Sequence, residues 1–387
     1  MAEDIRGGRG LLERTPTALV VALVAVRIVV LASLIAAAVR NPVTDVAVLR
    51  AQRIASSPAI PYRNFPVESM PLQTLADRVL GGGSSSSVAI RIAVLAFVAD
   101  LAAAWALAWG WGRRPSVVYL LLGLPLLPIV YLRFDLVSVA LAVWAAAWIR
   151  HRGETLGGAT LGVAVMAKLW PIVLAPLLLV RRARSGVIAF LGVIVLLGAW
   201  WYLTGGPKGP FQVATFRDAR GWHTQSVVGD LLWLFGRGPA YVEADALRIG
   251  YAATWVKGVL LLGLLACELA IWRRASIRGG DVAGGPSLAA IAALTVFSPL
   301  FAAQFAAWFL PWTALAFEGD GVDRRAAMAA TVAIALTGLI GFAWTDPTAT
   351  PATWLRWLVL ARNVVTIGVV VLWLRSRSRS VVPAGVS

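Results

Sequence analysis

Cysteine, histidine and charged residues are scarce in this sequence. Its 387 residues include one cysteine, Cys267, and two histidines, His151 and His223. A single cysteine excludes an intrachain disulfide and a cysteine-based metal site. The chain also lacks a Walker loop, a nucleophile elbow and a dinucleotide fingerprint, so no nucleotide-binding loop or hydrolase triad is expected.

Low charge excludes an ordinary soluble domain. Charged residues make up 14% of the chain, whereas soluble proteins contain about 25%. Hydrophobic residues make up 59%, and the mean hydropathy is +0.78. A soluble core cannot absorb that much apolar surface, but a bilayer can. The composition therefore predicts an integral membrane protein.

The basic residues fall in short clusters between apolar runs. Lys and Arg total 35 against 19 acidic residues, yet they form no basic domain, so a nucleic-acid partner is not expected. Such clusters mark cytoplasmic loops. With a cytoplasmic N-terminus, all of these clusters and the C-terminal arginines lie inside: 113–114, 150–152, 181–182, 273–274, 324–325, and Arg375, Arg377 and Arg379.

The apolar runs predict an all-α, polytopic bundle of about twelve spans that forms one membrane domain over 1–387. The first run exceeds the 7–15 apolar residues of a signal peptide and is expected to remain as a span. The expected spans are 16–39, 88–112, 116–132, 136–149, 155–167, 169–180, 186–204, 251–272, 286–300, 303–317, 326–344 and 353–374.

A break is expected within 155–180. Each half has about 12 residues, short of the about 20 that a perpendicular helix needs to cross a bilayer. Lys168 and Pro171 lie between the halves, and proline interrupts a helix. Short, broken helices in membranes border a polar cavity or are buried in protein. We therefore predict a re-entrant hairpin that points Lys168 toward a site.

Two long segments, 40–87 and 205–250, are expected on the outer side and are the expected location of the active site. The first has the pattern of two short amphipathic helices, over 45–56 and 72–80, joined by a proline-rich loop. Asp45 begins this segment. A carboxylate there can act as a general base, or it can cap the following helix.

The loop 61–71 is dense in aromatic, charged and proline residues. Tyr62 or Phe65 can stack on a sugar, and Arg63 or Glu68 can bind hydroxyl groups. The alternative is a loop that simply covers the bundle.

Two cations further along, Arg133 and Lys168, are candidate ligands for a phosphate, and Asp135 lies two residues after Arg133. Arg133 and Asp135 lie in a tight outer turn, too close in sequence to face each other on a helix, so each is expected to have another partner. Asp135 either orients Arg133 or caps the next helix. Lys168 lies in an apolar context, where a charge needs a partner such as a phosphate, or else reaches toward the interface.

The remaining polar candidates fall into two groups. Arg27 and Asp100 lie near the midpoints of antiparallel spans, and a structural ion pair explains both. Arg220, His223 and Gln225 crowd the second outer segment. His223 can transfer a proton or bind a phosphate oxygen, or it is a solvated loop residue.

The order of these motifs resembles one family, the bacterial polyprenol-phosphate-mannose-dependent α-mannosyltransferases of the GT-C superfamily. The resemblance runs along most of the chain. Three departures leave the acceptor and the activity open: Ser69-Met70 within the loop, Gln225 where the family often has glutamate, and Leu300 where glutamine is expected. The matching stretches are Asp45, 61–72, 133–135, 168–171, 220–226, 298–299 and 308–311.

The resemblance implies transfer of a sugar from a polyprenyl-phosphate donor to a glycolipid or cell-envelope glycan at the outer face of a bacterial plasma membrane. Asp45 would be the catalytic base. The implied substrate- and phosphate-binding residues are Tyr62, Arg63, Glu68, Arg133, Asp135, Lys168, Arg220, His223 and Gln225. The donor is already activated, so no cofactor is expected, and the need for a divalent metal stays open.

Two other functions fit the same pattern. In a transporter or lipid flippase, Arg27, Asp100 and the broken 155–180 hairpin would line a path across the membrane. A transporter needs polar residues at mid-depth, whereas here the richer set lies in the outer segments. An inactive homologue that serves as a subunit of a complex is the third possibility, left open by Gln225.

Overall fold

Helices dominate the computed structural model, which describes residues 17–41, 43–214, 219–236, 238–279, 281–346 and 348–375. Within this part of the chain, seven helices are long and apolar enough to cross a membrane. They coincide with seven of the predicted spans: α2 (Thr17–Arg40), α5 (Ser85–Trp111), the run of α6, η1 and α7 (Arg113–Val130), α11 (Arg184–Gly205), α14 (Thr254–Arg278), α17 (Gly321–Ala343) and α18 (Thr353–Arg375).

The count of twelve spans is not confirmed, because the other five predicted spans are short or broken helices. The longest of them, α8, has 16 residues and rises only about 24 Å, less than the about 30 Å of a hydrocarbon core. These helices are α8 (Asp135–Arg150), α9 (Glu154–Ala167), η2 with α10 (Trp170–Leu174 and Pro176–Val180), α15 (Gly285–Phe297) and η3 with α16 (Ala303–Trp308 and Leu310–Ala316).

The predicted break at Lys168 is confirmed. Lys168 has extended backbone angles, φ −156° and ψ 137°, and separates α9 from η2. A second break lies at 298–302, between α15 and η3. Trp170 and Trp308, one from each broken pair, stack with ring centroids 5.4 Å apart. The two interruptions are therefore brought together inside the bundle.

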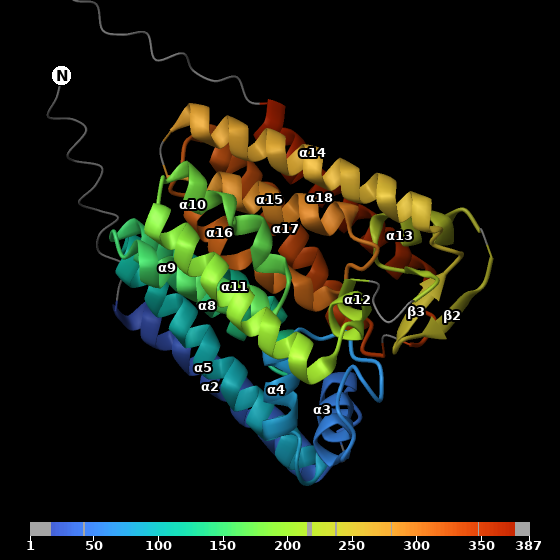
Figure 1. Cartoon of the computed structure of the whole chain (residues 1–387). Coiled ribbons are helices and arrows are strands. Elements are labelled where there is room, and N and C mark those ends of the chain that lie inside the picture. The colour runs from blue at the N-terminus through green and yellow to red at the C-terminus, as the bar shows by residue number, and fades with distance from the viewer. Residues whose placement is uncertain are drawn as a thin grey trace, which may run out of the picture.

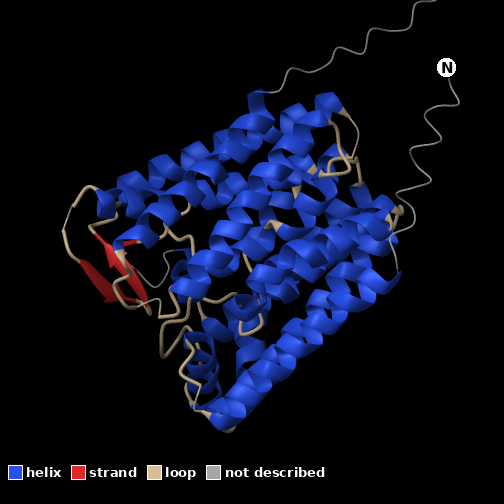
Figure 2. Cartoon of the chain, turned by 180° about the vertical axis from the view of Figure 1, so that it is seen from behind, coloured by secondary structure: helices blue, strands red, loops and turns tan. Residues whose placement is uncertain are grey.

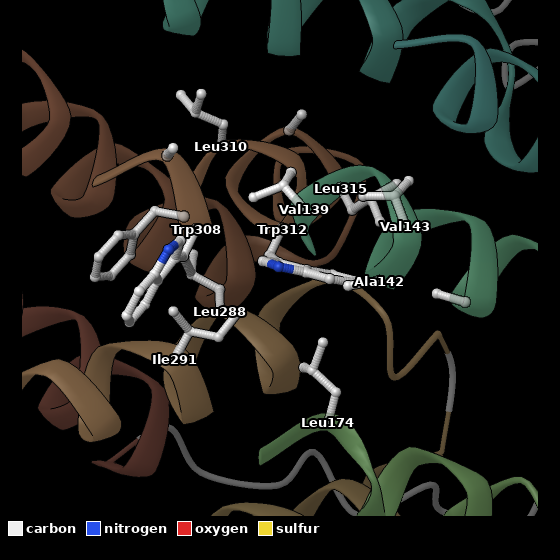
Figure 3. Close-up of a cluster of buried hydrophobic side chains, with 14 of the residues drawn as sticks. Val139, Ala142, Val143, Leu174, Leu288, Ile291, Trp308, Leu310, Trp312 and Leu315 are labelled. Atoms are coloured by element: carbon white, nitrogen blue, oxygen red, sulfur yellow. The ribbon is translucent and has the colours of Figure 1, made fainter. Parts of the chain in front are cut away.

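The short helix α16 is buried among other helices rather than exposed to lipid. Figure 3 shows Trp312 of α16 between Ala142 of α8 and Leu288 of α15, with Leu174 of η2 close by. Trp312 is fully buried. Burying a large aromatic side chain contributes a few kcal/mol to stability.

The basic clusters gather at one end of the bundle. Asp281 accepts hydrogen bonds from the Trp111 indole (2.5 Å), Arg150 (2.6 Å) and Arg181 (3.0 Å), which come from the C-terminal ends of three different helices. The helices α3 (Val46–Ser56), α4 (Pro71–Leu80) and α12 (Lys208–Ala214) lie at the opposite end (Figure 1). The two predicted amphipathic helices of the first outer segment are thus confirmed as α3 and α4.

A small three-stranded sheet, which the sequence did not predict, accompanies the mostly helical fold. The order is β1 (Trp222–His223), β3 (Ala246–Ile249), β2 (Ala240–Glu243), and both pairings are antiparallel. Ala244 and Asp245 form the turn with positive φ values of 52° and 58°, as a tight hairpin requires. Figure 2 shows these strands at one end of an otherwise helical molecule. Strands of two and four residues are too short to show an alternating pattern in sequence.

Candidate active site

Asp45 combines a structural contact with an open carboxylate oxygen. Its Oδ1 accepts a hydrogen bond from the Ala47 amide (2.8 Å), so the expected helix cap is confirmed for α3. The same Oδ1 pairs with Arg133 Nη1 at 2.5 Å. The side chain is 20% exposed, and within the described residues Oδ2 makes no hydrogen bond. Oδ2 is therefore available to accept a proton.

Arg133 holds Asp45 with one nitrogen and keeps others available. Its Nη1 donates to Asp45 and to the Leu132 carbonyl (3.0 Å). Its Nε and Nη2 make no hydrogen bond within the described part of the chain. A guanidinium group can bind a phosphate through two parallel donors, so these two nitrogens can receive an anion next to Asp45.

Asp135 and Lys168 form a second ion pair deeper in the bundle. Lys168 Nζ lies 2.6 Å from Asp135 Oδ2, and the Trp308 indole donates to Asp135 Oδ1 at 2.7 Å. Asp135 is 1% exposed, whereas the Lys168 side chain is 21% exposed. The residue that caps α8 is Phe134, so the capping alternative for Asp135 is wrong. The expectation that Arg133 and Asp135 have different partners is confirmed.

A third group of charges comes from α3, α4 and the loop between them. Arg50 Nε lies 3.0 Å from Asp77 Oδ2, and Arg50 Nη1 lies 3.8 Å from Glu68 Oε1. Burial raises the pKa of Asp77, although Arg50 opposes the shift. Arg50 also interacts electrostatically with Asp135, and Lys168 interacts electrostatically with Arg50 and Arg133. The three groups therefore share one electrostatic environment.

The loop residues Tyr62 and Arg63 have different surroundings. Tyr62 is 4% exposed, has a positive φ of 68°, and its hydroxyl donates to the Ser69 carbonyl at 2.6 Å. Burial raises its pKa. In this conformation the ring maintains the shape of the loop and offers no open face for a sugar. Arg63 is exposed and donates to the Leu203 carbonyl at 2.8 Å.

His223 is buried rather than solvated, which corrects the alternative given above. It belongs to β1, is 5% exposed, and its Nδ1 accepts from the Gln225 amide at 3.2 Å. Burial, with Arg248 and Arg362 nearby, lowers its pKa to about 3, so the imidazole is neutral at pH 7. The Arg220 side chain is exposed, while its backbone amide donates to Glu243.

Gln225 belongs to a buried polar network that the sequence analysis missed. Arg362 Nη1 of α18 donates to Gln225 Oε1 (3.2 Å), and Asn363 Nδ2 donates to Asp230 Oδ2 (3.1 Å). Burial raises the pKa of Asp230 to about 7. Arg362 is an ionisable residue inside an apolar helix, and the rule that singled out Arg27 would also have singled it out.

A stack of aromatic rings joins this network to the first cluster. Arg362 lies 3.9 Å from the centroid of Phe301, and Phe301 stacks on Phe305 (6.5 Å). Phe305 stacks on Trp308 (4.0 Å), whose indole donates to Asp135. The second outer segment therefore contacts the Asp135–Lys168 pair through buried rings of the second helix break.

The predicted pair at mid-depth is confirmed as structural. Arg27 Nε lies 2.7 Å from Asp100 Oδ2, and both residues are at most 2% exposed. The hydroxyl groups of Tyr119 (2.6 Å) and Tyr131 (3.0 Å) donate to Asp100, and Arg27 also donates to the Leu120 carbonyl. Buried charges are stable when they are paired and hydrogen-bonded in this way.

No protein-family model and no curated protein matches this chain. The arrangement that bears on its function lies at the end of the bundle opposite the basic clusters. That arrangement offers a carboxylate oxygen open to a proton, on Asp45, next to a cation open to an anion, on Arg133.

Proposed function

We propose that this chain is a membrane glycosyltransferase. It moves a sugar from a polyprenyl-phosphate donor to a glycolipid or cell-envelope glycan, and the resemblance of its motifs implies that the sugar is mannose. One observation carries the proposal: Asp45 Oδ1 is held by Arg133 at 2.5 Å, while its Oδ2 is left open beside that cation. A base for a hydroxyl group and a receptor for a phosphate are thus adjacent.

The chemistry is a single inverting displacement. Asp45 Oδ2 removes the proton from the acceptor hydroxyl as its oxygen attacks the anomeric carbon. The bond from that carbon to the phosphate oxygen breaks, and the polyprenyl phosphate leaves with the electron pair. Arg133 and Lys168 stabilise the charge that grows on the leaving phosphate, where preorganised cations are most effective.

Exposure favours Asp45 over Asp135 as the base. Asp135 is 1% exposed, and both of its oxygens accept hydrogen bonds, from Lys168 and Trp308. Asp45 is 20% exposed and has one oxygen without such a bond among the described residues. Asp135 therefore positions Lys168, and Asp45 is the carboxylate that an acceptor can reach.

Two exposed arginines can complete the phosphate site. Arg133 and Lys168 are each offset by a carboxylate, so a bound phosphate would benefit from further cations. Arg63 and Arg220 are exposed and form no ion pair within the described residues. They lie in the two outer segments and can move toward a phosphate without breaking a buried contact.

The orientation follows from charge. The end that carries the Arg150 and Arg181 clusters is cytoplasmic by the positive-inside rule. Asp45 then faces the outside of a bacterial plasma membrane, and both termini lie in the cytoplasm. Polyprenyl-phosphate sugars present their head groups at that outer surface, where no nucleotide is needed.

Reconstitution tests the proposal directly. The purified chain in proteoliposomes receives polyprenyl-phosphate mannose and a lipid extract of the bacterial envelope, and products are identified by mass spectrometry. We expect one hexose added to an envelope lipid or glycan, with release of polyprenyl phosphate. Movement of the labelled donor across the bilayer without any product would instead support the transporter alternative.

A further inference from the structure

The structure contains a second candidate site, at the basic end of the bundle and outside the proposed active site. A cavity of about 410 Å³ lies between α10 and α14. Its walls are formed by Pro176, Leu179 and Val180 on one side and by Leu269 and Trp272 on the other. Leu179 and Leu269 are 65% and 71% exposed, so the cavity lies on a face of the bundle that lipid would cover.

The polar groups of this cavity occupy two depths. Arg273 and Ser276 line it close to the basic end, and Arg182 follows its Val180 wall by two residues. Arg182 and Arg273 are exposed and form no ion pair within the described residues. Glu268 lines the cavity five residues before Arg273, which places it about 7.5 Å deeper along α14.

Glu268 has an oxygen that needs a partner. Its Oε2 accepts a hydrogen bond from the Trp272 indole at 3.0 Å, while its Oε1 is buried and has no hydrogen-bond partner. A carboxyl group in hydrocarbon without a cation nearby is most stable as the neutral acid. The acid form offers an O–H donor on a side chain that lines the cavity.

We propose that this cavity binds an anionic glycerophospholipid of the leaflet at the basic end. The phosphate lies on Arg273, one acyl chain fills the space between Leu179 and Leu269, and the Glu268 acid donates to an ester carbonyl. In a glycerophospholipid the ester carbonyls lie several ångströms deeper than the phosphate, in the same order as Glu268 and Arg273. Basic pockets between membrane helices recognise anionic head groups by this charge complementarity.

This proposal is independent of the proposed sugar transfer. It uses none of the residues around Asp45, and it requires only that a lipid of the surrounding bilayer enters from the side. The bound lipid would fix α14 against α10. The buried residues of α14 are Ile271, Trp272 and Ala275, so most of this helix is otherwise not packed against protein.

Lipid binding to the full chain in neutral detergent tests the proposal, with native mass spectrometry as the readout. Phosphatidylglycerol is compared with phosphatidylcholine, inorganic phosphate and polyprenyl phosphate. We expect phosphatidylglycerol to bind about tenfold more tightly than phosphatidylcholine, since one charge-assisted contact is worth about that factor. Equal affinity for the two phospholipids, or displacement of phosphatidylglycerol by inorganic phosphate alone, would overturn the proposal.

Variants locate the site. Arg273→Gln should weaken phosphatidylglycerol binding about tenfold, whereas Arg113→Gln, an exposed arginine outside the cavity, should leave it unchanged. Glu268→Gln retains a donor and should bind normally, while Glu268→Leu should bind less. Leu179→Trp should prevent the acyl chain of the lipid from entering the cavity. Tighter binding of polyprenyl phosphate that also depends on Arg273 would assign the cavity to the donor lipid and refute the phospholipid.

Discussion

At the scale of single residues, ionisable side chains next to apolar sequence were the most informative signal. The Arg27–Asp100 pair could be predicted because both residues occupy the middle of antiparallel spans, and the pair measures 2.7 Å. The separate partners of Arg133 and Asp135 could be predicted from their spacing. The sequence could not predict which carboxylate pairs with which cation, because the partners are far apart: Asp45 and Arg133 are separated by 88 residues.

The Asp135–Lys168 pair yields a prediction about stability. Asp135→Asn leaves the Lys168 ammonium without a counterion in a mostly buried position, so we expect the chain to lose about 3 kcal/mol of stability. Lys168→Met should lower stability by a similar amount, because it leaves the buried Asp135 carboxylate without its cation. The double variant should lose less than the sum of the two single losses.

Unfolding in mixed micelles with increasing denaturing detergent measures these differences. Arg63→Gln is the control, because Arg63 is exposed and forms no ion pair within the described residues. Additive losses for Asp135→Asn and Lys168→Met would mean that the two side chains do not stabilise each other.

At the scale of helices and strands, the long elements were predictable and the short ones were not. Seven apolar runs of 18 residues or more appear as continuous helices because a run of that length has no other stable form in a membrane. The short helices α15 and α16 were read as spans, since apolar composition does not distinguish a crossing from a helix buried in protein. The sheet was missed because its strands have only two and four residues, too few to show an alternating pattern in sequence.

The stability of the chain should depend on pH through a carboxyl group between α13 (Val227–Leu234) and α18. Burial raises the pKa of Asp230 from its ordinary value of 3.8 to about 7. Between those values the folded chain retains a proton that the unfolded chain has released, so stability should fall as the pH rises from about 4 to 7 and then level off. The charged and titratable groups that act on Asp230 or lie in the same network are Arg362, His223 and Arg248.

The pH dependence of the melting temperature, Tm, tests this prediction. In Asp230→Asn the decline of Tm between pH 5 and pH 7 should be smaller by a few degrees. Asp346→Asn is a matched control, since Asp346 is an exposed turn residue. Identical slopes in the wild type and in Asp230→Asn would show that Asp230 is already ionised at low pH.

At the scale of the whole molecule, charge separates the two ends. Two of the basic clusters, 150–152 and 181–182, meet at Asp281, and the carboxylate–cation clusters of Asp45, Asp77 and Asp135 come from elements at or near the opposite end (Figure 1). The sequence predicted this division, because loop charge and loop length can be read without knowing the packing. It could not predict that two helix breaks meet through Trp170 and Trp308.

The role of Asp45 is the central claim, and turnover of the Asp45→Asn variant tests it most directly. Asparagine keeps an oxygen that can cap α3 but cannot accept a proton from a hydroxyl group. In the reconstituted assay with polyprenyl-phosphate mannose, we expect transfer to fall at least about a hundredfold while Tm stays close to the wild-type value. Asp346→Asn should transfer normally. An Asp45→Asn variant with near-normal turnover would contradict the account.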